Sequence, residues 1–118
     1  MKIKIANQPK RYIHKNLAAG GWQKLSLMEQ MGNIGSEISR ALNWRGKDKK
    51  LYENAIDRAF ELLDLTISDP RWQNRLKEIV RTRELLCDAI LGGKEYKTSL
   101  KDLDRYFFHF ALAARVNR

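Results

Sequence analysis

The sequence predicts an all-α protein: an up-down-up-down four-helix bundle with a basic, extended N-terminal arm. Three observations predict this fold. Four segments carry apolar residues at spacings of three and four, which is the period of an amphipathic helix. Helix start and stop signals separate these segments. Their connections are short, and short connections favour antiparallel neighbours that share one core. We expect residues 1–21 to form the arm and residues 22–118 to form the bundle domain.

The first helix is expected to begin after Ser26 and to end near residues 45–46. Ser26 and Glu29 have the spacing of a capping box, in which each side chain accepts a hydrogen bond from the other residue's backbone amide. Small residues lie along one side of this helix, where glycine costs about 1 kcal/mol relative to alanine. We interpret them as a close approach of another helix, with a groove for a ligand or partner as the alternative. They are Gly32, Gly35, Ser36 and Ser39.

The second helix starts near Asp48 and stops before residue 68. The third has Asp69 as its N-cap and Pro70 at the first helical position, where proline removes no hydrogen bond. It closes at the glycine pair 92–93. Ser99 opens the fourth helix. The four helices are each about 17–22 residues long, or about 26–33 Å, so every apolar stripe can reach one core.

Arg83 lies inside the apolar stripe of the third helix. We favour an interpretation in which its stem runs along the edge of the core and its guanidinium reaches water. The alternative is an inter-helix salt bridge, because an unpaired buried charge is very costly. The candidate partners are Glu37, Asp57 and Asp64. A ligand-binding arginine is the third interpretation.

Positive charge is concentrated at the N-terminus. The net charge is +9, and the first 28 residues hold six basic residues and no acid. A basic arm on a nearly balanced body predicts contact with a polyanion. A second basic cluster follows the first helix, where Trp44 either stacks on an unpaired base or closes the end of the core. The candidate nucleic-acid-binding residues are Lys2, Lys4, Lys10, Arg11, Lys15, Lys24, Trp44, Arg45, Lys47, Lys49 and Lys50.

The sequence predicts no disulfide, no metal or cofactor site and no catalytic site. Cys87 is the single cysteine, so no internal disulfide can form and a reducing cytoplasm is the expected location. His14 and His109 are the two histidines and neither has metal-ligand spacing, so we expect no metal and no cofactor. No apolar run approaches the ~18–20 residues of a membrane span. The chain carries no catalytic signature, which favours a non-enzymatic protein.

Arg105 and His109 lie four residues apart near the end of the chain. A small, basic, all-helical bundle with such a pair resembles the HEPN superfamily, many of whose members are ribonucleases or partners of minimal nucleotidyltransferases. The HEPN motif has four to six residues between Arg and His and usually a polar residue after the Arg. This chain has three, and Tyr106 follows the Arg. In size, charge and architecture the chain also resembles the basic four-helix accessory proteins of diversity-generating retroelements and the bundles encoded in ribosomal RNA intervening sequences. Those proteins bind nucleic acid and assemble as ring-like oligomers.

The leading hypothesis is a non-enzymatic nucleic-acid-binding or accessory protein that contacts phosphates through its arm and the loop at 45–50. The alternatives are a protein–protein interaction module and a HEPN-type ribonuclease or nucleotidyltransferase partner. The expected partners are RNA or DNA, a protein, and further copies of the chain. The homo-oligomer is inferred from a short strand pattern containing Ile3 and Ile5 that has no partner strand, and from Trp22, which we expect to lack cover within one protomer.

Overall fold

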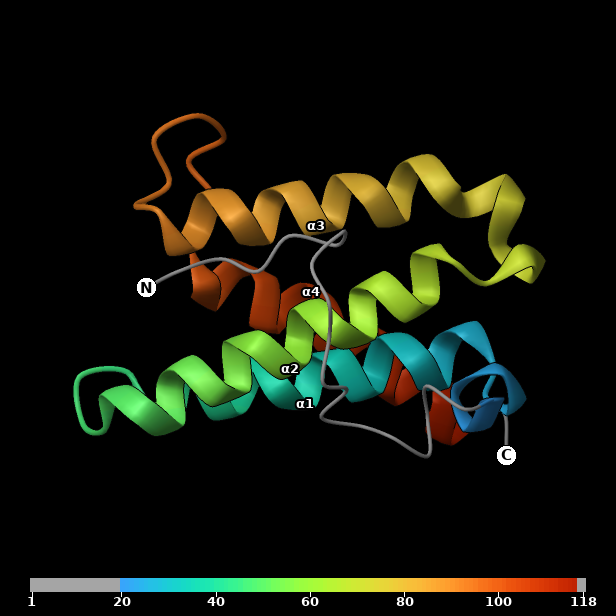
Figure 1. The fold of residues 1–118 in the computed structure, drawn as a ribbon, viewed down its shortest axis with the longest axis horizontal. Helices are drawn as coiled ribbons and strands as arrows, with labels where there is room; N and C mark the ends of the chain where they lie inside the picture. The colour runs from blue at the N-terminus through green and yellow to red at the C-terminus, as the bar shows by residue number, and fades with distance from the viewer. Residues whose placement is uncertain (1–19, 117–118) are drawn as a thin grey trace.

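The computed structural model describes residues 20–116, and these are almost entirely helical (Figure 1). Residues 20–116 contain no strand. The arm, including the strand pattern near its start, lies outside the described residues. The helical elements are η2 (Trp22–Lys24), α1 (Leu27–Trp44), α2 (Lys49–Ile67), η3 (Pro70–Arg75), α3 (Leu76–Ile90) and α4 (Leu100–Val116). The predicted all-α fold is confirmed. Between residues 20 and 116, no helix combines the length and apolar character that crossing a membrane requires.

The helices α1 to α4 form an up-down-up-down bundle. Successive helices run in opposite directions, as the colour gradient in Figure 1 shows. The helix α1 packs closely against both α2 and α4, whereas α3 contacts α2 and α4 more loosely. The predicted bundle is therefore confirmed, with α1 at the centre of the packing.

The start of α1 is the capping box that the sequence predicts. The Ser26 hydroxyl accepts a hydrogen bond from the Glu29 amide at 3.1 Å, and the Ser26 amide donates to Glu29 Oε1 at 3.0 Å. The helix ends at Trp44, and the Arg45 amide donates to the Ala41 carbonyl. Two otherwise unpaired amides are satisfied at the start, which fixes where the helix begins.

The third helix begins differently from the prediction. Pro70–Arg75 is a 3-10 helix, and Trp72 has non-helical dihedral angles (φ −104°, ψ 24°). Its indole Nε1 donates to Gln30 Oε1 at 2.9 Å, which ties this turn to α1. The Arg71 guanidinium donates to Asp69 Oδ2 at 2.7 Å and to the Leu25 carbonyl at 2.8 Å. The bonds to Gln30 and to the Leu25 carbonyl tie this turn to a remote part of the chain, and the regular α-helix starts only at Leu76.

Trp22 is part of the core, which corrects one argument for an oligomer. Its side chain is only 1% exposed, and its Nε1 donates to Thr66 Oγ1 at 2.9 Å. Gln30 is also buried and donates through Nε2 to the Trp22 carbonyl at 2.8 Å. The expectation that this tryptophan lacks cover within one protomer is wrong, because η2 folds back onto α1 and α2.

The small residues of α1 serve a close approach of α4. A Cβ added at Gly35 would lie 2.6 Å from Phe107 Cβ, and one added at Gly32 would lie 3.3 Å from Ala111 Cα. A larger residue at position 35 would therefore push the two helices apart. The interpretation of these glycines as a helix–helix contact is confirmed.

Arg83 forms the inter-helix salt bridge and does not end in water. Its Nε lies 2.8 Å from Asp64 Oδ1, and its guanidinium lies 4.9 Å from the centre of the Phe60 ring. The two charged side chains are buried to a similar extent, with 21% of Arg83 and 20% of Asp64 exposed. The favoured interpretation of a solvated guanidinium is wrong, and of the three candidate acids Asp64 is the partner.

Candidate nucleic-acid interface

The topology brings two connections to the same end of the bundle. The α1–α2 connection and the α3–α4 connection both lie at the left of Figure 1. We call residues 45–50 and 94–102 together the basic end. They are some fifty residues apart in the sequence, and antiparallel packing is what places them at one end.

The α1–α2 connection is a tight turn that exposes four cations. The amides of Lys47 and Asp48 both donate to the Trp44 carbonyl, at 2.9 and 3.0 Å. Gly46 adopts φ +81°, which side chains rarely allow. Asp48 then caps α2 by accepting the Leu51 amide at 3.0 Å. The turn leaves its basic side chains exposed at the surface: Arg45, Lys47, Lys49 and Lys50.

The α3–α4 connection is built around a buried carboxylate. Asp88 accepts the amides of Glu95 and Tyr96, at 3.0 and 3.1 Å. Gly93 has φ +71° and approaches the Thr98 carbonyl so closely that a Cβ would lie 3.2 Å from that oxygen. The backbone of the loop is anchored by these contacts. The basic side chains of the connection and of the first turn of α4 are exposed: Lys94, Lys97 and Lys101.

The start of α4 completes this connection. Ser99 and Asp102 satisfy each other's amides, with the Ser99 amide donating to Asp102 Oδ2 at 3.1 Å and the Asp102 amide donating to Ser99 Oγ at 3.0 Å. The hydrogen bond from the Ser99 amide holds the pKa of the Asp102 carboxyl below its ordinary value. This acid therefore stays charged near the lysines and is occupied by helix capping.

Cations outnumber acids at the basic end. The two connections hold seven basic residues and three acids. Two of the acids, Asp48 and Asp102, accept backbone amides at the N-termini of helices. Capping holds these carboxylates against the backbone, so they are less free to reach the lysines around them. The basic end therefore carries a net positive charge that its own acids do not balance.

Arginine and lysine are used differently in this protein. Each of the ion pairs between described residues uses an arginine, namely Arg40–Glu37, Arg71–Asp69, Arg75–Glu78, Arg81–Glu84 and Arg83–Asp64. Within residues 20–116, no lysine forms an ion pair with a described acid. The lysines of the basic end are therefore available to an external anion.

Lys24 does not join the other predicted residues. It lies in η2, before the start of α1, whereas the α1–α2 connection follows the end of α1. The 18 residues of α1 span about 27 Å at 1.5 Å per residue. Lys24 is therefore at the opposite end of the bundle from Lys47. The remaining predicted basic residues lie outside the described part of the chain: Lys2, Lys4, Lys10, Arg11 and Lys15.

Two aromatic side chains accompany the cations. Trp44 is half-buried at the end of α1. Tyr96 is 38% exposed, and the Arg81 guanidinium covers one face of its ring at 4.1 Å from the ring centre. The sequence interpretation missed Tyr96 and the three lysines of the α3–α4 connection. The signal was available, because an up-down-up-down order requires that connection to lie at the same end of the bundle as residues 45–50.

The residues behind the HEPN resemblance lie elsewhere. Arg105 and His109 are both exposed on α4, beyond the basic end. No group of three metal-binding side chains occurs among residues 20–116. Comparison of the chain with protein-family models, curated proteins and solved structures finds no match.

Proposed function

We propose that this protein binds nucleic acid without catalysing a reaction on it, through phosphate contacts made by the basic end. The observation that supports the proposal is that two connections, remote in sequence, lie at the same end of the bundle, and that their seven basic side chains form ion pairs with none of the described acids. Solvated lysines that face no internal acid are the usual source of sequence-independent affinity for a phosphate backbone.

The composition of the basic end favours phosphate contacts over base reading. Lysine is a flexible point charge, whereas reading a base edge generally requires fixed, paired donors and acceptors. Trp44 and Tyr96 provide ring surfaces on which an unpaired base can stack. We therefore expect weak sequence preference and stronger binding to single strands than to duplexes. The arm cations Lys2, Lys4, Lys10, Arg11 and Lys15 would add further phosphate contacts.

The test is a fluorescence-anisotropy titration of single- and double-stranded DNA and RNA at several salt concentrations. One variant, Lys49→Gln/Lys50→Gln, neutralises the α1–α2 connection, and a second, Lys94→Gln/Lys97→Gln, neutralises the α3–α4 connection. The matched control, Lys24→Gln/Lys77→Gln, removes the same charge from exposed positions at the opposite end of the bundle.

Each lost phosphate contact should reduce the slope of log K against log salt by about 1. Both basic-end variants are expected to lose about 2 in slope, and the control much less. Equal losses in all three variants would mean that only the total charge matters, which would contradict a localised interface. Binding without a salt slope would contradict the proposal itself.

A further inference from the structure

A hollow of about 340 Å³ lies between α3 and α4. It is lined by two buried residues, Thr82 of α3 and Leu103 of α4. Leu85 and Tyr106, which are half-buried, add apolar surface to its walls. Pockets for small ligands have volumes of about 300–1,000 Å³ and combine apolar walls with a few placed polar groups. The hollow therefore has the size and the lining of a ligand site.

The two ends of the hollow differ. At the end away from the basic end, the Tyr106 hydroxyl donates to Glu78 Oε1 at 3.2 Å, and Arg75 Nε donates to Glu78 Oε2 at 3.0 Å. Burial raises the pKa of Tyr106, so its hydroxyl remains a donor at neutral pH. The other end is lined by Thr98 and Asp102. These two residues belong to the α3–α4 connection, so the hollow and the basic end share part of their surface.

Arg81 links the hollow to an exposed aromatic ring. It lines the hollow, and its guanidinium lies 4.1 Å from the centre of the Tyr96 ring. Its ion pair with Glu84 is 3.7 Å long, which is longer than a hydrogen bond. A guanidinium can stack on a base and can also donate hydrogen bonds to a phosphate. Arg81 therefore has both properties that contact with a nucleotide requires.

We propose that this hollow binds a nucleobase, which a single strand held at the basic end presents to it. The inference rests on the proposed function and adds a site for one nucleotide. A strand whose phosphates lie on the lysines of the α3–α4 connection passes the residues shared with the hollow, Thr98 and Asp102. A base in a duplex is paired and stacked, whereas an unpaired base can turn into a pocket at little cost.

The polar groups of the hollow favour a base that carries an amino group. The carboxylates of Glu78 and Asp102 line it and accept hydrogen bonds. Thr82 donates its hydroxyl proton to the Glu78 carbonyl at 2.9 Å, so its oxygen can act as a further acceptor. Cytosine has an amino group where thymine has a carbonyl oxygen. We therefore expect the hollow to prefer cytosine to thymine.

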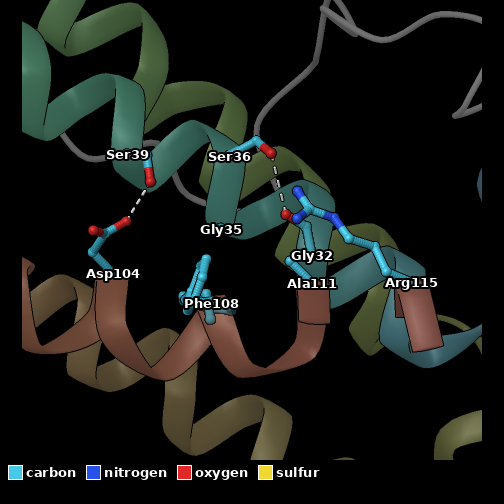
Figure 2. Close-up of a pocket in the computed structure, with 9 residues that line it drawn as sticks. Gly32, Gly35, Ser36, Ser39, Asp104, Phe108, Ala111 and Arg115 are labelled. Carbon is cyan, nitrogen blue, oxygen red and sulfur yellow. Dashed lines mark hydrogen bonds between the residues drawn. The ribbon is translucent and has the colours of Figure 1, made fainter. Parts of the chain in front are cut away.

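A second hollow provides a matched control. It lies between α1 and α4, has a volume of about 290 Å³, and is lined by Ser36, Phe108 and Arg115 among others (Figure 2). Asp104 also lines it and accepts a hydrogen bond from the Ser39 hydroxyl. None of the described residues that line this second hollow belongs to the basic end. A strand bound at the basic end should therefore not place a base in it.

The experiment compares three strands of equal length by fluorescence anisotropy, using the full chain at several salt concentrations. The strands are oligo(dC), oligo(dT) and an abasic strand, which carries the same phosphates without bases. The unmodified chain should bind oligo(dC) about tenfold more tightly than the abasic strand, because each stacked base contributes about 1–3 kcal/mol. The salt slope should be the same for both strands, and oligo(dT) should bind with intermediate affinity.

Variants that fill the hollow test its role. Leu85→Trp fills it from α3 and Thr98→Leu narrows it from the loop, and neither changes the charge. Both should remove most of the advantage of oligo(dC) over the abasic strand and leave the salt slope unchanged. Lys94→Gln/Lys97→Gln should do the reverse, lowering the slope by about 2 and keeping the advantage. Ser36→Trp, which fills the second hollow, should change neither quantity. Circular dichroism checks that each variant is folded.

Backbone amide chemical shifts then locate the base. Oligo(dC) and cytidine monophosphate should both shift the amides of Thr82, Leu85 and Leu103, and neither should shift that of Ser36. Shifts with the mononucleotide but no binding of any strand would support the base site and contradict the proposed function. An advantage of oligo(dC) that survives both Leu85→Trp and Thr98→Leu would overturn the base site and leave the proposed function standing. The absence of shifts around the hollow with both ligands would overturn it as well.

Discussion

Gly35→Ala should destabilise the protein although alanine is the better helix former. The new Cβ would lie 2.6 Å from Phe107 Cβ, whereas carbon atoms in contact are about 3.5–4.0 Å apart. The helices α1 and α4 would therefore have to separate by about 1 Å along a seam that is closely packed. Overpacking of this kind costs typically about 1–3 kcal/mol, against a gain in helix propensity of about 1 kcal/mol. We expect a net destabilisation of about 1 kcal/mol.

Gly32→Ala is the matched control. It has the same gain in helix propensity, but its Cβ would lie 3.3 Å from Ala111 Cα, which a small adjustment can relieve. We expect this variant to be as stable as the unmodified protein or slightly more stable. The measurement is urea denaturation followed by circular dichroism, with the free energy of unfolding compared between the two variants. A Gly35→Ala protein at least as stable as Gly32→Ala would refute the reasoning that the glycine permits the close approach.

Three further perturbations test individual contacts. Asp64→Ala should lower the free energy of unfolding, measured by urea denaturation, by about 1–2 kcal/mol, because it leaves the mostly buried Arg83 side chain without its salt bridge. Asp69→Asn should flatten the loss of stability below about pH 4: the hydrogen bond from Arg71 holds the pKa of Asp69 below its ordinary value of 3.8, so the stability it contributes is present above that pH and is lost as the pH falls through the lowered pKa. Melting curves at pH 3 and pH 6 measure this. Trp22→Phe should lower the free energy of unfolding by about 1 kcal/mol because the hydrogen bond to Thr66 is lost, and an unchanged value would contradict the role assigned to that bond.

The positions of the helices could be predicted because their signals are local. Ser26 and Glu29 are three residues apart, and each needs only the other to fix the start of α1. The start of α3 could not be predicted in the same way. Asp69 and Pro70 are good starting residues, but the turn after them is shaped by Gln30 on another helix, which accepts the indole N–H of Trp72. No pattern within residues 69–75 contains that contact.

The basic end also shows the difference between local signals, which the sequence reveals, and neighbours that only the fold brings together. The cations at 45–50 form a run in the sequence, so composition alone identifies them. Lys94, Lys97 and Lys101 are spread over eight residues with Glu95 among them, and they join the other cations only because the fold places both connections at the same end of the bundle. For Arg83 the sequence supplied the set of acids that could pair with it, but choosing Asp64 requires the relative rotation of α2 and α3.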